Sequence, residues 1–176
     1  MAVCKLTKDI LKSNVCGYSL KQIVDLYLGN YEDVTKVELD TDGYTVKTIT
    51  MAESAKWYHI EPAKDSASYT DELATGDSGS KYRVHTVNFS VSGDYDAEQA
   101  ANLDALALGR YIAVAKLSNG KYVMFGRLTP LEATTATLSS AAEATGFNGE
   151  QFVLTCNTIE PALPMSDGAI EQVVGA

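Results

Sequence analysis

The stretch RYIAVAKLSNGKYVMFGR, residues 110–127, decides the fold. Two apolar segments flank Asn119-Gly120, the dipeptide that most readily forms a two-residue type I′ turn. Pairing that runs outward symmetrically from this turn places Leu117 opposite Tyr122 and Val114 opposite Phe125. The expected faces are Ile112, Val114, Val123 and Phe125 on one side, and Tyr111, Ala113, Ala115, Leu117, Tyr122 and Met124 on the other. Both faces are largely apolar, which predicts a hairpin in the middle of a packed sheet.

Strand patterns continue on both sides of this hairpin. Strands are expected at residues 23–28, 36–39, 44–49, 55–61, 81–92, 133–138 and 151–159. Residues 94–108 predict the best helix of the chain, because Asp94 or Asp96 can cap its start and Gly109 is a natural stop. The fold class expected is mainly β: an antiparallel β-sandwich or barrel with one flanking helix and a long loop. Residues 1–161 are interpreted as a single β-sandwich domain, with an arm or short helix around Thr7–Lys12 in its first twenty residues.

Two segments remain outside this expected core. Pro62–Ser80 is rich in Ala, Ser, Asp, Thr and Gly, and is interpreted as a long polar loop. Residues 162–176, interrupted by Pro164 and Gly168, are interpreted as a loosely attached C-terminal tail. We expect both segments to form contacts between subunits, through Pro62, Asp65, Ser68, Tyr69, Asp71, Leu73, Ile170 and Val173.

Composition and charge limit the classes of function that this chain can have. The chain has 176 residues and a net charge of −9, which argues against binding nucleic acid through its phosphates. No apolar run is long enough to span a bilayer, and the first residues lack the apolar region of a secretory signal, so synthesis in the cytoplasm is expected. Of the three cysteines, Cys156 is interpreted as a buried apolar residue. Cys4 and Cys16 have no metal-binding spacing, and a disulfide between them is possible but has no motive in a reducing compartment.

The candidate chemical motifs have simpler explanations. Gly76-Asp77-Ser78-Gly79 resembles a protease nucleophile segment, but His59 lies only nineteen residues upstream and no context for a catalytic triad surrounds it. Asp40–Gly43 fits a hairpin turn better than a calcium loop. His59 and His85 could face one another if their strands pair, yet they lack further metal ligands. We therefore expect no catalytic residue, cofactor or metal, and the chain is not interpreted as an enzyme.

The C-terminal half resembles a known family. The residues that carry this resemblance are YVMFG (122–126), LEATTAT (131–137), the Gly/Asn break at 146–149 and FVLTCNTIEP (152–161). They resemble structural proteins of tailed bacteriophages and of prophages of gut bacteria, in particular tail tube-like proteins. The resemblance implies a virion protein of the tail that stacks as hexameric rings, contacts other tail proteins and conducts DNA as non-specific cargo through its lumen.

A second hypothesis comes from another class of protein. A monomeric carbohydrate- or peptide-binding β-sandwich would need a cluster of exposed aromatic side chains. The candidates for such a cluster are Trp57, Tyr58, Tyr69 and Tyr82.

Overall fold

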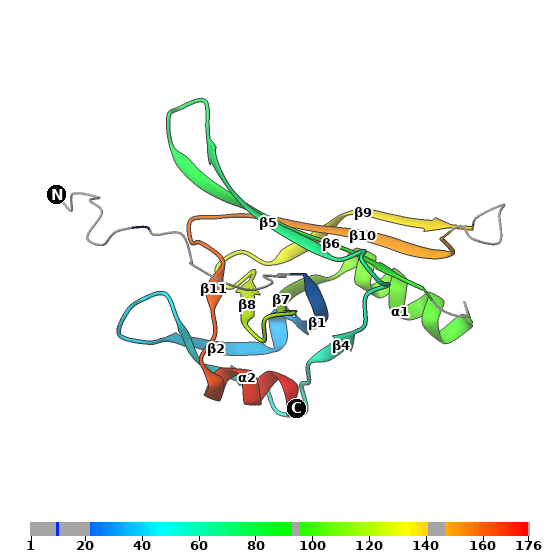
Figure 1. Ribbon diagram of the computed structural model, residues 1–176, viewed down its shortest axis with the longest axis horizontal. Helices are drawn as coiled ribbons and strands as arrows, with labels where there is room; N and C mark the ends of the chain where they lie inside the picture. Colours follow the sequence, from blue (N-terminus) through cyan, green and yellow to red (C-terminus); the bar gives the residue numbers. More distant parts are fainter. Residues whose placement is uncertain (1–9, 11–21, 93–95, 141–146, 176) are drawn as a thin grey trace, which may run out of the picture.

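The computed structural model describes residue 10 and residues 22–92, 96–140 and 147–175, and it is mainly β (Figure 1). In chain order the elements are β1 (Ile23–Asn30), a 3-10 turn (Tyr31–Asp33), β2 (Val34–Leu39), β3 (Val46–Met51), β4 (Tyr58–Ile60), β5 (Ser68–Thr75), β6 (Lys81–Val91), α1 (Ala97–Leu108), β7 (Arg110–Leu117), β8 (Tyr122–Phe125), β9 (Leu131–Ser139), β10 (Gly149–Thr158), β11 (Leu163–Pro164) and α2 (Asp167–Val174). The expected antiparallel, mainly β class with a helix beside the sheet is confirmed. The sheet is not closed into a barrel.

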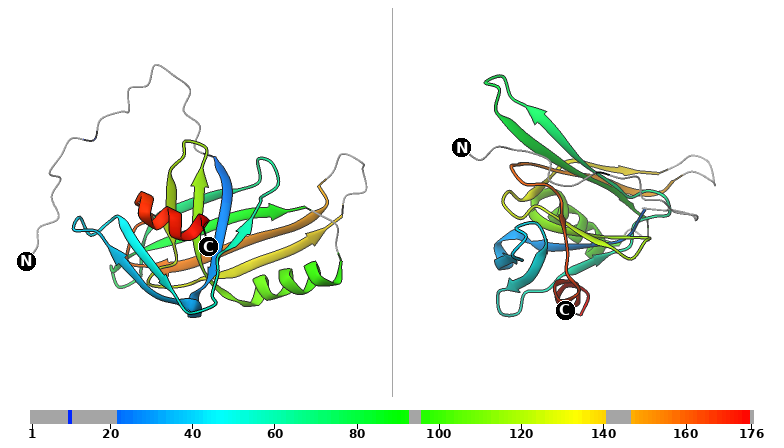
Figure 2. Two further views of the ribbon diagram at one scale, coloured as in Figure 1. Left: turned by 90° about the horizontal axis from the view of Figure 1, so that it is seen from below. Right: turned by 60° about the vertical axis from the view of Figure 1, so that its left-hand side comes forward.

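Nine strands form one antiparallel sheet. Its order is β11-β8-β7-β9-β10-β6-β5, and β1 pairs with β7 on one side and with β4 on the other. The sheet folds over, so that β5, β6, β9 and β10 lie above β1, β4, β7 and β8 (Figures 1 and 2). The main core fills the space between these layers and includes Leu26, Phe89, Ala113, Phe152 and Leu154.

A second core lies on the other side of β7. There the two-stranded sheet β2-β3 and the helix α2 cover Ile112, Val114 and Met124. Strand β7 is therefore apolar on both faces because each face belongs to a different core. The expectation of a hairpin inside packed structure is confirmed.

The register of this hairpin differs from the expectation by one residue. Val114 pairs with Met124 and Ala113 with Phe125. The loop has three residues, closed by Leu117 N–H donating to the Lys121 carbonyl at 2.8 Å, and among its residues only Gly120 has a positive φ, of 79°. A type I turn followed by a left-handed Gly replaces the type I′ turn. Because a one-residue slip exchanges the faces of a strand, the β7 faces were predicted correctly and those of β8 were reversed.

The segment Pro62–Ser80 is not a long loop, so that prediction was wrong. Residues Ser68–Thr75 form β5, which pairs with β6 along its whole length, and only Gly76–Ser80 form the turn. Its sequence, SYTDELAT, has no face that is consistently apolar, which is why the strand pattern was missed. The β5–β6 hairpin projects beyond the rest of the sheet (Figure 1).

The two helices differ in how well the sequence predicts them. α1 begins after Asp96, whose side chain accepts from the Gln99 N–H at 2.8 Å, and ends at Gly109 as expected. α2 was not predicted, so the described residues contain two α-helices instead of the one expected. Residues 162–176 are not loosely attached over their described part: β11 pairs with β8, and Ala169 and Val173 of α2 are buried in the second core. The arm expected at Thr7–Lys12 lies outside the described residues except for Ile10.

Candidate interaction surface

The four strands β9, β10, β6 and β5 form the outer layer of the molecule. Their side chains alternate between the main core and the outside, so Phe152 pairs with Phe89 and Leu154 with Val87 on the core side. On the outer side Thr70, Thr86 and Thr155 lie in one row across three strands, and Ser68, Asn88 and Val153 form the next. The outer face is thus built mainly from small, uncharged polar side chains.

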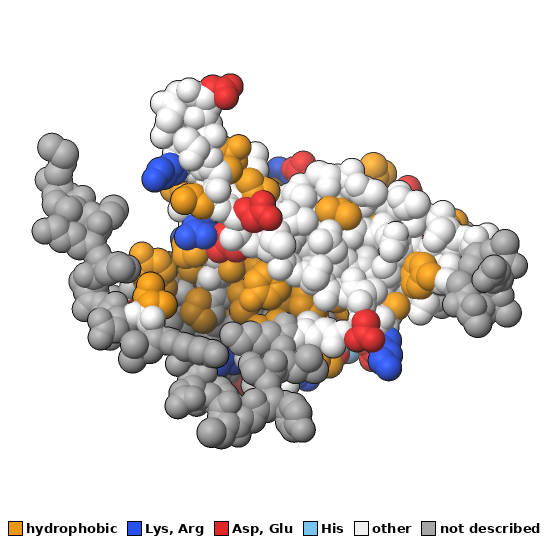
Figure 3. Space-filling view, turned by 45° about the horizontal axis from the view of Figure 1, so that its top comes forward, with side chains coloured by type: hydrophobic (Ala, Val, Ile, Leu, Met, Phe, Trp, Pro, Cys, Tyr) orange, Lys and Arg blue, Asp and Glu red, His pale blue; other side chains and the backbone are white. Residues whose placement is uncertain are grey.

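Charge on this outer face is sparse and of one sign. The strand registers place Glu72 and Glu132 on it, and place no Lys or Arg of these four strands there. Figure 3, which brings the top of the molecule forward, shows a largely white surface with few charged side chains. A surface of this kind gives a phosphate backbone no cation to bind.

The same four strands have two open edges. β5 pairs only with β6, and β9 pairs with β7 only at its first two residues, so in the described part of the chain the outer edges of 68–75 and 133–139 carry no neighbouring strand. Open edges present backbone N–H and C=O groups that can pair with another chain. β9 was predicted as a strand but not as an edge. The sequence did contain a signal for an edge strand, because the mixture of Thr, Ala and Ser in β9 forms no apolar face.

Polar contacts anchor the base of the projecting hairpin. Asp71 on β5 accepts from Arg83 Nη1 at 2.9 Å and from the backbone N–H of Ala162 at 3.0 Å. Tyr69 packs against Phe125 with ring centroids 4.9 Å apart. Beyond this level the hairpin leaves the core, and Leu73 is 61% exposed. The outer half of the hairpin therefore has no apolar partner among the described residues of its own chain.

The residues predicted for subunit contacts do not form one surface. Pro62 and Asp65 lie in the connection before β5, where Asp65 accepts from Gln22 Nε2 at 2.6 Å. Ser68, Tyr69, Asp71 and Leu73 lie on β5, and of these Ser68 and Leu73 are exposed. Ile170 and Val173 lie on α2, on the opposite side of the molecule, where Val173 is only 1% exposed. The β5 residues are thus separated from the α2 residues by the layer that contains β7.

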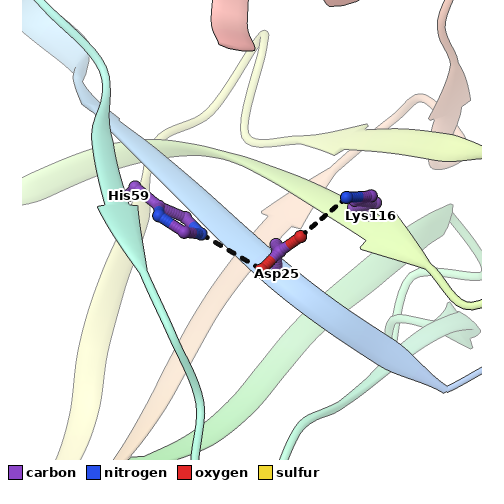
Figure 4. A network of polar contacts seen from close by, with 3 residues as sticks. All are labelled: Asp25, His59 and Lys116. Carbon is purple, nitrogen blue, oxygen red and sulfur yellow. Dashed lines mark hydrogen bonds and ion pairs between the residues drawn. The ribbon is translucent and has the colours of Figure 1, made fainter.

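One polar network crosses three neighbouring strands (Figure 4). Asp25 on β1 lies between His59 on β4, with Nε2 3.1 Å from Oδ1, and Lys116 on β7, with Nζ 2.9 Å from Oδ2. Burial raises the pKa of Asp25, but the hydrogen bonds from Lys116 and His59 outweigh it and leave the pKa below its ordinary value. His59 also stacks on Tyr27 at 4.8 Å. These contacts link side chains of three strands that are already paired through their backbones, and sequence reasoning did not find them.

The two histidines do not face one another, because β4 and β6 do not pair and the condition for that arrangement is not met. His85 pairs across strands with Asp71 and Cys156, and its ring is 1% exposed against the edge of Phe125. Burial lowers the pKa of His85, although the charges of Asp71 and Glu160 act in the opposite direction. Burial and the nearby Glu160 raise the pKa of Cys156 to about 11, which keeps this thiol protonated at neutral pH. The burial predicted for Cys156 is confirmed.

The other residues considered for catalysis or ligand binding do not come together in a site. Ser78 lies at the exposed tip of the β5–β6 hairpin, whereas His59 bonds to Asp25 on β1. Of the aromatic candidates for ligand binding, Trp57 is buried in the second core and Tyr69 packs against the main core. In the described ranges no three His, Cys, Asp or Glu side chains come together in a way that could hold a metal. Neither described helix has the length and apolar character needed to cross a membrane.

Comparison of the chain with protein-family models, with curated proteins and with solved structures gives no match.

Proposed function

We propose that this chain is a virion structural protein of the tail tube type, which assembles with copies of itself into a ring that conducts DNA. One observation carries the proposal: in the described part of the chain, the strands β9-β10-β6-β5 of the sheet leave one open edge along β5 and another along residues 133–139 of β9. A closed ring requires two different patches that meet head to tail, and these two edges are such a pair.

Strand direction favours this contact. Neighbouring strands in β9-β10-β6-β5 are antiparallel, so the two outer strands run in opposite directions. When a copy is related to the next by rotation about a ring axis parallel to the strands, β5 of one copy meets β9 of the next in antiparallel orientation. The contact therefore continues the pattern of the sheet, and it pairs backbone groups that are open in the single chain.

The outer face of this sheet suits the wall of a DNA channel. It carries Glu72 and Glu132 and many small polar side chains, and the whole chain has a net charge of −9. Weak repulsion of phosphate lets DNA move through the lumen without binding tightly. The resemblance of residues 110–161 to tail tube-like proteins points to the same function, and so does the ring of six copies that it implies.

The test is assembly of the full chain at high concentration, followed by light scattering and negative-stain electron microscopy. Rings or tubes are expected for the native protein. A variant in which residues 74–82 are replaced by Asn-Gly keeps Tyr69 and Asp71 and leaves Leu73 paired with Arg83, so it should fold as a monomer and form no rings. Shortening the Asp40–Thr45 turn between β2 and β3 is the matched control and should leave rings intact. A native protein that stays monomeric over a wide range of concentration and salt contradicts the proposal.

A further inference from the structure

An apolar groove lies between α1 and the ends of β9, β10 and β6. Its floor is one cross-strand row, in which Glu150 pairs with Leu138 on one side and with Val91 on the other. α1 contributes Leu103 and Gln99 to the opposite wall, and the hollow has a volume of about 350 Å³. Leu138 is 55% exposed, so the groove has an apolar wall that no described part of the chain covers.

The groove is also acidic. Burial raises the pKa of Glu150, and the charge of Asp104 on α1 raises it further. Neither carboxylate forms an ion pair with any Lys or Arg that the structure describes. The described residues 96–109, 133–140 and 147–152, which lie at this end of the sheet, contain four acidic residues and no Lys or Arg. An occupant with both apolar and cationic groups would therefore complement this groove.

The chain itself contains such a segment. Residues 1–21 have four Lys and one Asp, a net charge of +3, in contrast to the net charge of −9 of the whole chain. Lys5, Lys8 and Lys12 alternate with Leu6, Ile10 and Leu11 in this segment. Ile10 is 84% exposed, so its own domain does not cover this apolar side chain.

The position of this segment favours a groove on another molecule. β1 begins beside Leu117, the end of β7 that is remote from α1, because Ile23 pairs with Leu117 whereas α1 ends just before Arg110. Twenty-one residues can extend up to about 70 Å. That length is more than enough to reach a neighbouring copy.

We propose that residues 1–21 of one copy bind in the groove between α1 and β9-β10 of a second copy. Leu6 and Ile10 contact the wall formed by Leu103 and Leu138, and the lysines lie against Glu150 and Asp104. This contact is separate from the pairing of sheet edges proposed above and does not depend on it. An experiment can therefore contradict one of the two proposals and leave the other intact.

Cys4 supplies the probe for the test. In the full chain, Cys16→Ser leaves Cys4 as the only thiol of the segment, and Leu138→Cys places a thiol at the exposed wall of the groove. Copies labelled with ¹⁴N and ¹⁵N are mixed and oxidised, and the disulfide peptides are mapped by mass spectrometry. We expect a disulfide between Cys4 and position 138 with mixed isotope labels. Glu53→Cys, at an exposed site outside the groove, is the matched control. The yield of its disulfide with Cys4 should be at least tenfold lower than the yield at position 138.

Charge reversal sharpens this test. Lys5→Glu, Lys8→Glu and Lys12→Glu together should reduce the yield of the Cys4–138 disulfide at least tenfold. Adding Asp104→Lys and Glu150→Lys to the copy that carries Leu138→Cys should restore it. Equal yields at positions 53 and 138, a yield that ignores charge reversal, or a disulfide within single copies would each overturn the proposal. The readout is a disulfide between two copies and does not require a ring. If this disulfide forms but rings do not, only the proposed pairing of sheet edges is contradicted.

Discussion

The two long hairpins of this protein, β7–β8 and β5–β6, have the same antiparallel pairing but differ in how far they are buried. β7 is buried on both faces, because one face belongs to the main core and the other to the second core under β2-β3 and α2. β5 is anchored at its base by Tyr69 and Asp71, and beyond them its side chains have no core to enter. The first hairpin stabilises the single chain, whereas the second leaves backbone and side chains available to another copy.

The largest expected difference between these hairpins comes from removing one apolar side chain from each. Phe125 is 1% exposed and touches Tyr69 and His85, so Phe125→Ala should lower the free energy of unfolding by about 3–5 kcal/mol. Leu73→Ala on β5 should change the stability of the monomer by less than about 0.5 kcal/mol. Urea denaturation at low protein concentration measures both. Equal losses would mean that the two hairpins are equally part of the core.

A smaller contrast concerns two glycines with similar backbone angles. Gly126, after β8, has φ 85°, and an added Cβ would lie 2.9 Å from the Tyr111 carbonyl oxygen. Gly79, at the tip of β5–β6, has φ 79° and open space around it. Strain and contact together should make Gly126→Ala cost about 3 kcal/mol, against about 1 kcal/mol for Gly79→Ala. Thermal unfolding that ranks the two in the opposite order contradicts the description of the β8–β9 connection.

The smallest expected effect is a dependence on pH at the junction of the two hairpins. His85 has a lowered pKa in the folded chain, so below its ordinary pKa of 6.5 the unfolded chain binds more protons. Stability should therefore fall as the pH decreases from about 6.5, by at most about 1.4 kcal/mol per pH unit for one proton.

Replacing this buried histidine isolates its contribution. His85→Leu should flatten the stability profile between pH 7 and 5, whereas His59→Gln should preserve the slope that His85 causes. Denaturation midpoints at several pH values supply the measurement. A profile that is equally steep in the His85→Leu variant assigns the pH dependence to other groups.

The comparison also shows what the sequence could and could not predict. The strands around Asn119-Gly120, the β2–β3 hairpin and the helix capped by Asp96 carry strong local signals, and all three were found. The register of β7–β8 was missed because Asn119-Gly120 is compatible with both a two-residue and a three-residue loop, and only tertiary packing selects between them. Strand β5 was missed because SYTDELAT has neither an apolar face nor β-branched enrichment, and its pairing with β6 supplies the order instead.

The candidate interaction surface was predicted only in part. β5 contains Ser68 and Leu73, which were named for subunit contacts and are exposed. Val173 was named on the same grounds and is buried, because the alternation of apolar residues in α2 also fits a helix that packs on its own domain. The open edge of β9 could not be read from the sequence, since an edge is defined by the strands that are not beside it. Sequence patterns therefore locate strands better than they locate the ends of a sheet.

The most direct test of the central claim is hydrogen exchange, measured by mass spectrometry on dilute monomer and on concentrated, assembled protein. We expect the amides of 68–75 and 133–139 to exchange at least tenfold more slowly in the assembly, because both edges then have a neighbouring strand. The amides of β7 should exchange slowly and equally in both states. Unchanged exchange at β5 and β9 in a protein that has assembled would contradict pairing through these edges.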